Sequence, residues 1–333
     1  MASPEKKRIP VSEAIALCIG ILVERGIRED YALMVAEHLV DAALAGHPFA
    51  GLPRVLAIVS QLQGRSPATP VRILNETENS AQIDGGDNLG YVVSTIAIDK
   101  AVELARRSGI GMVGVNNTWY SGRLAYYVER AAKQGFVAIH TTSAQARVAP
   151  YAGIDPILGT NPLSMGFPCD PEPIVIDIGT SMATEGEVMR RQALNVELPS
   201  GWAIDPDGAP TIDAKTVWEG ALLPWGGARG YSIALAVQLL GILSGGKAVV
   251  ATPSDVGQFF LVVDPERLMP LADFKTRASK LAETIRESRP SMGSDSVRIP
   301  GDRSQQSRRV EDARGEIEVD AGIYQQLIAL TNN

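Results

Sequence analysis

The chain has 333 residues, of which 45% are apolar and 21% charged, enough to bury the core of one or two globular domains. Its formal charge of −7 argues against a nucleic-acid-binding protein, whose surface carries an excess of basic residues. No apolar run is long enough to span a bilayer, and the first residues lack the apolar core of a signal peptide, so we expect a cytoplasmic protein without a membrane partner.

The N-terminal part of the chain has the spacing of amphipathic helices. Three helices are predicted, over residues 12–26, over residues 30–46 and from residue 53 onward. Ser12 is a typical N-cap residue, and Gly46-His47-Pro48 is a typical helix stop. Lys6-Lys7-Arg8, before the first helix, is expected to be a solvated tail. We assign residues 1–75 to this helical N-terminal segment.

From Ala81 the pattern alternates between helix and strand. Helices are predicted over residues 95–108, 120–135 and 231–243, and strands over residues 109–115, 136–140, 163–167, 174–177 and 259–263. In this interpretation residues 76–265 form an α/β core, and residues 266–333 form a C-terminal segment that returns to the N-terminal part. Within that segment, residues 287–309 are expected to be a long loop and residues 321–330 a closing helix.

The run Gly109 to Gly114 matches the glycine pattern of dinucleotide-binding folds. That pattern works only where the glycines follow a strand and open a helix, which directs the helix N-terminus at the pyrophosphate. Here a predicted helix precedes the glycines and a predicted strand follows them. We therefore interpret these glycines as the end of a helix and a site of close packing, and we expect no Rossmann fold.

Three turns rich in glycine and hydroxyl residues interrupt the apolar strands in the middle of the chain. They are Leu158 to Leu163, Asp177 to Ser181 and Gly226 to Tyr231. Their backbone N–H groups and hydroxyls suit a phosphate-bearing ligand, and Arg229 adds a cation that can bind an anion with two hydrogen bonds.

In this order the turns resemble those of the type-2 malate/L-lactate dehydrogenases, a nicotinamide-dependent family that includes ureidoglycolate dehydrogenase, sulfolactate dehydrogenase and piperideine-2-carboxylate reductase. Gly51-Leu52-Pro53-Arg54, Val113 to Thr118 and Pro300-Gly301-Asp302 extend the resemblance over nearly the whole chain. It implies a non-Rossmann, mixed-sheet α/β fold with a helical N-terminal segment, a homodimer, and NADH or NADPH as the cofactor.

The resemblance also implies the residues of the site. Cofactor contacts fall on Ser143, Asp177, Ile178, Gly179, Thr180, Ser181, Arg229, Gly230, Gly301 and Asp302. Substrate contacts fall on Phe49, Arg54 and Thr160. Arg54 is placed to hold a carboxylate through two parallel hydrogen bonds, and the alternative is a surface arginine after a helix break.

The family's acid–base histidines are replaced in this chain. Phe49 and Ala50 stand where a serine and a catalytic histidine are usual, and Tyr120 stands where the second histidine is expected. A histidine with a pKa near 6.5 suits proton transfer at neutral pH, whereas a phenol with a pKa near 10 needs a neighbouring cation or donor. The candidate catalytic residues are therefore Tyr120 and His47, with capping of a helix end as the alternative role of His47.

These replacements narrow the expected chemistry. A protonated cyclic imine brings its proton from solution, so it is the acceptor least affected by a missing acid. We expect an NAD(P)H-dependent reductase of a small carboxylate-bearing cyclic imine or keto compound. The alternative is a family member that catalyses a non-redox isomerisation, cyclisation or elimination, or an inactive binding protein. Three scattered histidines and two distant cysteines predict neither a metal site nor a disulfide.

Overall fold

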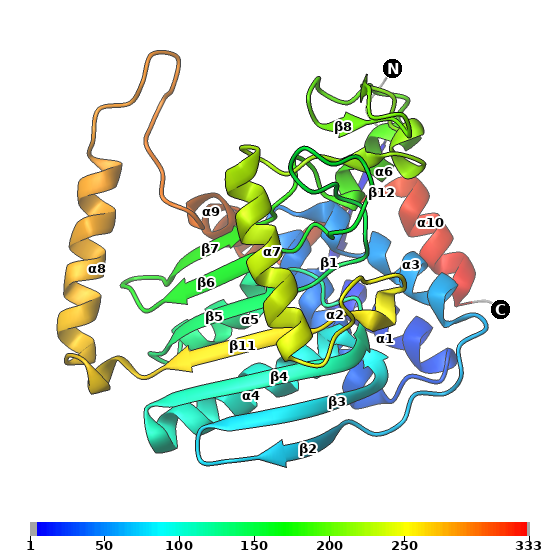
Figure 1. Ribbon diagram of the computed structural model, residues 1–333. Helices are drawn as coiled ribbons and strands as arrows, with labels where there is room; N and C mark the ends of the chain where they lie inside the picture. Colours follow the sequence, from blue (N-terminus) through cyan, green and yellow to red (C-terminus); the bar gives the residue numbers. More distant parts are fainter. Residues whose placement is uncertain (1–4, 332–333) are drawn as a thin grey trace. The chain divides into compact units, whose positions relative to one another are not determined.

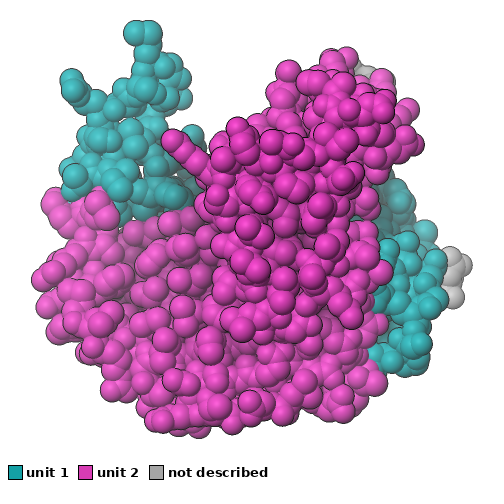
Figure 2. Space-filling model, viewed as in Figure 1, with its two compact units in different colours: residues 1–68, 282–333 teal, residues 69–281 magenta. Residues whose placement is uncertain are grey.

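The computed structural model describes residues 5–331 (Figure 1). It divides into two compact units, which are coloured separately in Figure 2. The terminal unit consists of residues 1–68 and 282–333, and the central unit consists of residues 69–281. Each unit has its own secondary structure and is described by itself.

The terminal unit is mostly helical. It contains α1 (Val11–Glu24), α2 (Glu29–Leu44), η1 (Pro48–Ala50), α3 (Pro53–Leu62), α9 (Asp302–Arg314) and α10 (Ala321–Leu330). The three N-terminal helices and the closing helix that the sequence predicts are therefore present. Their buried faces are made of aliphatic side chains, including Ile21, Leu22, Leu39 and Leu327.

Two predictions for this unit were wrong. Residues Lys6–Pro10 form β1 rather than a solvated tail, and β1 pairs antiparallel with β12 (Glu316–Asp320). An ion pair of 3.3 Å between Lys6 and Glu318 adds to this ladder, and an ion pair of 2.7 Å joins Arg8 to Glu311 in α9. The expected loop over residues 287–309 ends at Asp302, where α9 begins. No residue of α9 is buried, so the helix has no apolar stripe that periodicity could detect.

The central unit is built on a seven-stranded sheet. Its strands are β2 (Arg72–Glu76), β3 (Ser80–Leu89), β4 (Ile110–Trp119), β11 (Gln258–Val263), β5 (Val137–Thr142), β6 (Leu163–Phe167) and β7 (Ile174–Ile178), in that spatial order. Only β3 and β4 run parallel, and every other neighbouring pair is antiparallel. This mixed order confirms the predicted α/β class and differs from the parallel sheet of a Rossmann domain.

Helices cover both faces of this sheet. One face carries α4 (Gly90–Ser108) and α5 (Ala125–Ala132), and α7 (Ala228–Leu243) crosses the other face (Figure 1). The core under α4 and α5 includes His140, whose ring stacks on Phe260 with 3.9 Å between the centroids. Burial lowers the pKa of His140 to about 3, so this histidine is neutral at physiological pH and serves packing.

The glycine-rich run has the structural role that the sequence predicts. Gly109 ends α4 in the left-handed conformation, with φ of 90°, and β4 begins at the next residue. A Cβ atom on Gly111 would lie 2.0 Å from the carbonyl oxygen of Ala101 in α4. Glycine is needed here because the helix and the strand approach too closely for a side chain.

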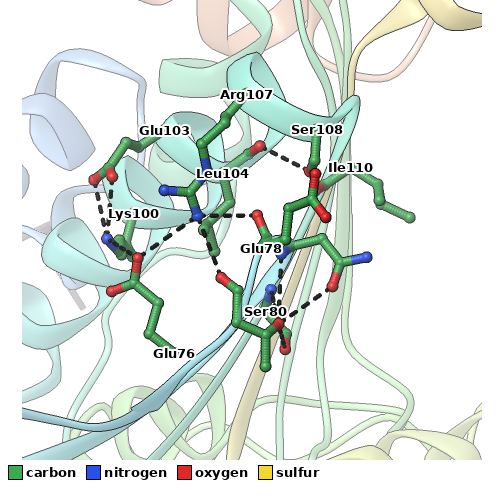
Figure 3. A network of polar contacts seen from close by, with 11 residues as sticks. Glu76, Glu78, Ser80, Lys100, Glu103, Leu104, Arg107, Ser108 and Ile110 are labelled. Atoms are coloured by element: carbon green, nitrogen blue, oxygen red, sulfur yellow. Dashed lines mark hydrogen bonds and ion pairs between the residues drawn. The ribbon is translucent and has the colours of Figure 1, made fainter.

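A polar network binds the exposed edge strand β2 and the turn that follows it to α4 (Figure 3). The Lys100 ammonium lies 2.9 Å from Glu76 and 3.1 Å from Glu103, and Arg107 donates to the backbone carbonyl of Glu78 at 3.0 Å. The hydrogen bond to Glu76 raises the pKa of Lys100. These contacts hold an edge strand whose own residues are all exposed.

The remainder of the central unit follows β7. It contains α6 (Glu185–Ala193), β8 (Ala203–Ile204), β9 (Pro210–Thr211), η2 (Thr216–Trp218), β10 (Ala221–Leu222), η3 (Pro253–Asp255) and η4 (Pro265–Arg267). Helix α8 (Leu271–Arg286) contains the boundary between the two units. Within residues 5–331, no helix combines the length and the apolar character needed to cross a bilayer.

Candidate active site

The structure brings together the three turns that the sequence singles out. The N–H and the hydroxyl of Thr180 both donate to the carbonyl oxygen of Thr160, at 2.9 and 3.0 Å. The Thr180 carbonyl in turn accepts from the N–H of Trp225 at 3.1 Å, next to the turn that opens α7. Thr180 thus links the turn after β7 to both of the other turns.

Asn161 also links these turns through its buried side chain. Its side chain is fully buried and its backbone has a positive φ of 32°. The side-chain oxygen accepts from the N–H of Ala144 at 3.0 Å, and the side-chain nitrogen donates to the Ala234 carbonyl at 2.9 Å and to Gln238 at 3.0 Å. The side-chain amide of Asn161 therefore links its own turn to the segment after β5 and to the middle of α7.

The first turn of α7 is suited to an anion. Arg229 is exposed there, and among residues 5–331 its side chain forms no hydrogen bond or ion pair. A cation in the first turn of a helix opposes the helix dipole, so an anion bound there would make its placement more favourable. A Cβ atom on Gly230 would lie 2.1 Å from the Trp225 carbonyl oxygen, which explains why the next residue is glycine.

The hydroxyls of the turns are largely engaged by the protein itself. Besides Thr180, the buried Ser143 hydroxyl accepts from the N–H of Gly257 at 2.9 Å, and Ser181 donates to the Ala183 carbonyl at 2.5 Å. Ile178 is 38% exposed and Gly179 is half-buried. Cofactor contacts at these positions remain predictions, and they would use backbone groups and the shape of the turn more than free hydroxyls.

Asp177 has the electrostatic properties of a proton-transfer group. Its carboxylate accepts from the N–H of Ala125, at the start of α5, at 2.9 Å. The surrounding protein raises the pKa of Asp177 to about 6 by desolvation, while that hydrogen bond and the charge of Arg123 oppose the shift. A carboxyl group with this pKa exchanges its proton near neutral pH.

Tyr120 lies in the loop between β4 and α5. This loop ends at Ala125, whose N–H donates to the Asp177 carboxylate. The predicted helix over residues 120–135 begins only at Ala125, because Tyr120 and Gly122 have positive φ values of 54° and 68°. The Tyr120 ring is half-buried, with its centroid 5.2 Å from that of Trp119. Tyr120 and Asp177 therefore belong to one region of the central unit, at the end of β4 and of β7.

The other predicted site residues belong to the terminal unit. The Nε2 atom of His47 lies 3.1 Å from the hydroxyl oxygen of Ser304, in the helix where a loop was expected. Phe49 is 37% exposed in η1, and Arg54 is half-buried at the second position of α3. Their roles toward a substrate remain predictions.

Gly301 and Asp302 form the start of α9. Gly301 is the N-cap residue, with φ of 94°. The Asp302 carboxylate accepts from the N–H of Ile299 at 3.0 Å and pairs with Arg286 at 2.6 Å. Burial alone would raise the pKa of Asp302, but these two partners lower it below its usual value. This carboxylate is therefore charged and already satisfied by protein groups.

Two features lie outside the sequence prediction. Asp177 was expected from its turn, but its raised pKa comes from desolvation by residues that folding brings around the carboxyl group of this otherwise exposed residue, which no motif encodes. A cavity of about 260 Å³, lined by the end of α6 and the segment before η2, contains none of the predicted site residues. Among residues 5–331, no cluster of histidine, cysteine and carboxylate side chains is suited to a metal ion.

Comparison with known proteins identifies the family to which the chain is similar. The profile of the family described as malate/L-lactate dehydrogenase matches residues 9–328. The chain is 30% identical to L-sulfolactate dehydrogenase of Methanocaldococcus jannaschii, over 95% of this chain and 94% of that protein. It is 35% identical to malate dehydrogenase of Pyrococcus abyssi, over 89% of this chain and 86% of that protein.

A solved structure extends the comparison to an imine reductase. The delta1-piperideine-2-carboxylate reductase of Pseudomonas syringae pvar. tomato superimposes with a TM-score of 0.88 at 26% identity. The match covers 97% of this chain and 99% of that one.

The buried amide of Asn161 should be a major source of stability for the three turns. Asn161→Ala leaves the N–H of Ala144 and the carbonyl of Ala234 without this partner, so we expect the free energy of unfolding to fall by about 2–4 kcal/mol. Urea denaturation followed by circular dichroism measures the loss. Asn75→Ala, on the exposed strand β2, is the matched control and should change stability by less than about 0.5 kcal/mol. Equal stability of the two variants would contradict this role of Asn161.

Proposed function

The chain belongs to the malate/L-lactate dehydrogenase family, and we propose that it is an NAD(P)H-dependent reductase of a small carboxylate-bearing cyclic imine or keto compound. Related proteins are named for reactions at sulfolactate, malate and piperideine-2-carboxylate. Each of these compounds carries a carboxylate next to the carbon that accepts or gives up hydride. Substrates of this type are therefore the first to test.

The observation that carries the proposal is the position of the exposed residue Asp177, whose carboxylate accepts from the N–H of Ala125 at 2.9 Å, where the loop that carries Tyr120 ends, and whose pKa is raised. Reduction of a C=O or C=N bond adds a hydride to carbon and a proton to oxygen or nitrogen. When bound, the nicotinamide supplies the hydride. A carboxyl group with a pKa of about 6 is protonated in a substantial fraction of molecules near neutral pH, so it can supply the proton in the absence of the family's histidines.

The remaining residues of the central unit have supporting roles in this proposal. Arg229 and the turn residues Ile178 to Ser181 hold the phosphates of the dinucleotide, because a guanidinium without an ion-pair partner among residues 5–331 and the backbone N–H groups of a turn suit an oxyanion. The Ala125 N–H orients the Asp177 carboxylate, with 2.9 Å between nitrogen and oxygen. Tyr120, on the loop that ends at Ala125, packs against the substrate and does not donate the proton.

We also propose that the protein is a homodimer. Leu235, Leu239 and Leu243 form a stripe on α7 and are 39%, 57% and 69% exposed. The stretch from Tyr231 to Gly246 contains no charged residue, so a second copy of the same face is a suitable partner. Sedimentation velocity should show twice the mass of one chain, and Leu239→Lys should shift the distribution toward monomer. A wild-type protein that sediments as a monomer at micromolar concentration would refute the dimer.

Dinucleotide binding can be tested without knowing the substrate. We expect wild-type protein to bind NADH or NADPH, and Arg229→Gln to weaken binding at least about tenfold through loss of a charge-assisted hydrogen bond. Calorimetric titration with both dinucleotides gives the two affinities. Arg190→Gln, an exposed arginine that pairs with Glu187, is the control. Absence of binding of both dinucleotides at millimolar concentration would rule out the reductase function.

The pKa of Asp177 predicts opposite pH dependences for the two directions. Reduction of a keto acid needs the protonated carboxyl, so kcat/KM for pyruvate or oxaloacetate should be level below pH about 6 and fall about tenfold per unit above it. Oxidation needs the carboxylate, so its kcat/KM should rise toward pH 6 and then stay level. Asp177→Asn should lower the rate about a hundredfold or more, and its kcat/KM should no longer show this pH dependence.

The matched control is Asp273→Asn, which removes an exposed carboxylate in the first turn of α8. It should leave both pH profiles unchanged. If Asp177→Asn keeps the wild-type profile, another group donates the proton, and Tyr120→Phe is then the next variant to measure.

A further inference from the structure

A second arginine lies beside the three turns and was not expected from the sequence. Arg147 follows β5, and its backbone N–H donates to the carbonyl of Leu158, the first residue of the turn before β6, at 2.8 Å. Its own carbonyl accepts from the N–H of Leu222 in β10 at 2.8 Å. The backbone of Arg147 is thus fixed between this turn and the small three-stranded sheet of β8, β9 and β10.

Within the part of the chain that the structure describes, the side chain of Arg147 has no polar partner. Its Nε atom is buried without a hydrogen bond, and among residues 5–331 the guanidinium makes no ion pair. Its central carbon lies 5.6 Å from the centroid of the Trp218 ring, the one side-chain interaction that the described part of the chain gives it. A half-buried cation without a counter-charge is unfavourable, because desolvation is not compensated by an acceptor.

The acidic residue of helix α6 that is ion-paired is paired with other arginines. Glu187, on α6, is occupied by Arg190 at 2.9 Å and by Arg191 at 2.7 Å. Its pKa is lowered by these partners, so the carboxylate is charged and already neutralised. The described residues 5–331 therefore give Arg147 an aromatic support, Trp218, but no ion-paired carboxylate.

We propose that Arg147 binds a phosphate group of the dinucleotide. This inference rests on the proposed function, because the ligand is the nicotinamide dinucleotide of that reaction. Arg147 is joined through Leu158 to the turn that Thr180 and Asn161 hold in place, so the cation belongs to the same assembly as Arg229. The guanidinium presents two parallel N–H donors that match the oxygens of a phosphate.

Two phosphate sources share this chemistry. The pyrophosphate is present in both NADH and NADPH, whereas the 2′-phosphate of the adenosine ribose is present in NADPH alone. A contact with the pyrophosphate affects both dinucleotides equally. A contact with the 2′-phosphate makes Arg147 a determinant of the preference for NADPH.

The test is calorimetric titration of wild-type protein and Arg147→Gln with NADH and with NADPH. We expect at least about a tenfold loss of affinity for one or both dinucleotides, as for loss of a charge-assisted hydrogen bond. Loss for both assigns Arg147 to the pyrophosphate, and loss for NADPH alone assigns it to the 2′-phosphate. Arg147→Lys should recover part of the affinity, since it keeps the charge and loses the paired donors.

The matched control is Arg106→Gln, because the Arg106 guanidinium also lies over an aromatic ring, 5.5 Å from the centroid of Phe136. It should leave both affinities unchanged. If Arg147→Gln binds both dinucleotides as tightly as the wild type, Arg147 only packs on Trp218 and the inference is wrong. Wild-type protein that binds neither dinucleotide would instead refute the proposed function itself, and the inference with it.

Discussion

The hydrogen bonds of the buried Asn161 side chain are the constraint on which the candidate site depends. Three elements far apart in the sequence meet at this amide: the segment after β5, the turn before β6 and the middle of α7. Thr180 then adds the turn after β7 through the Thr160 carbonyl. Because the buried Asn161 amide and Thr180 hydroxyl are satisfied by groups of the other segments, the turns are held in a defined arrangement, and so are the charged residues on them.

The charges of this assembly are unbalanced within the part of the chain that the structure describes. Arg229 and Arg147 have no carboxylate partner there, and desolvation favours the neutral form of Asp177. These properties favour a negatively charged ligand beside a group that can donate a proton. They fit a dinucleotide and a carbonyl or imine better than they fit a purely structural role.

The sequence predicts the elements that have a strong local pattern. The strand at residues 163–167 and the helix at residues 321–330 have the predicted bounds, because apolar spacing and flanking turn residues define them. α9 was missed because none of its residues is buried, and β1 because its ladder with β12 joins opposite ends of the chain. The three turns could be predicted from the resemblance. The pKa of Asp177 and the missing partner of Arg147 could not, because both depend on residues brought together by folding.

Hydrogen–deuterium exchange of the protein with and without a saturating dinucleotide tests the central claim most directly. The account predicts slower exchange on addition of NADH or NADPH in peptides that cover residues 158–163, 177–181 and 226–231. The β2–β3 hairpin, residues 72–89, should exchange at the same rate in both samples. Bound dinucleotide without protection of these turns, or with protection confined to other parts of the central unit, would contradict the claim that the three turns form the cofactor site.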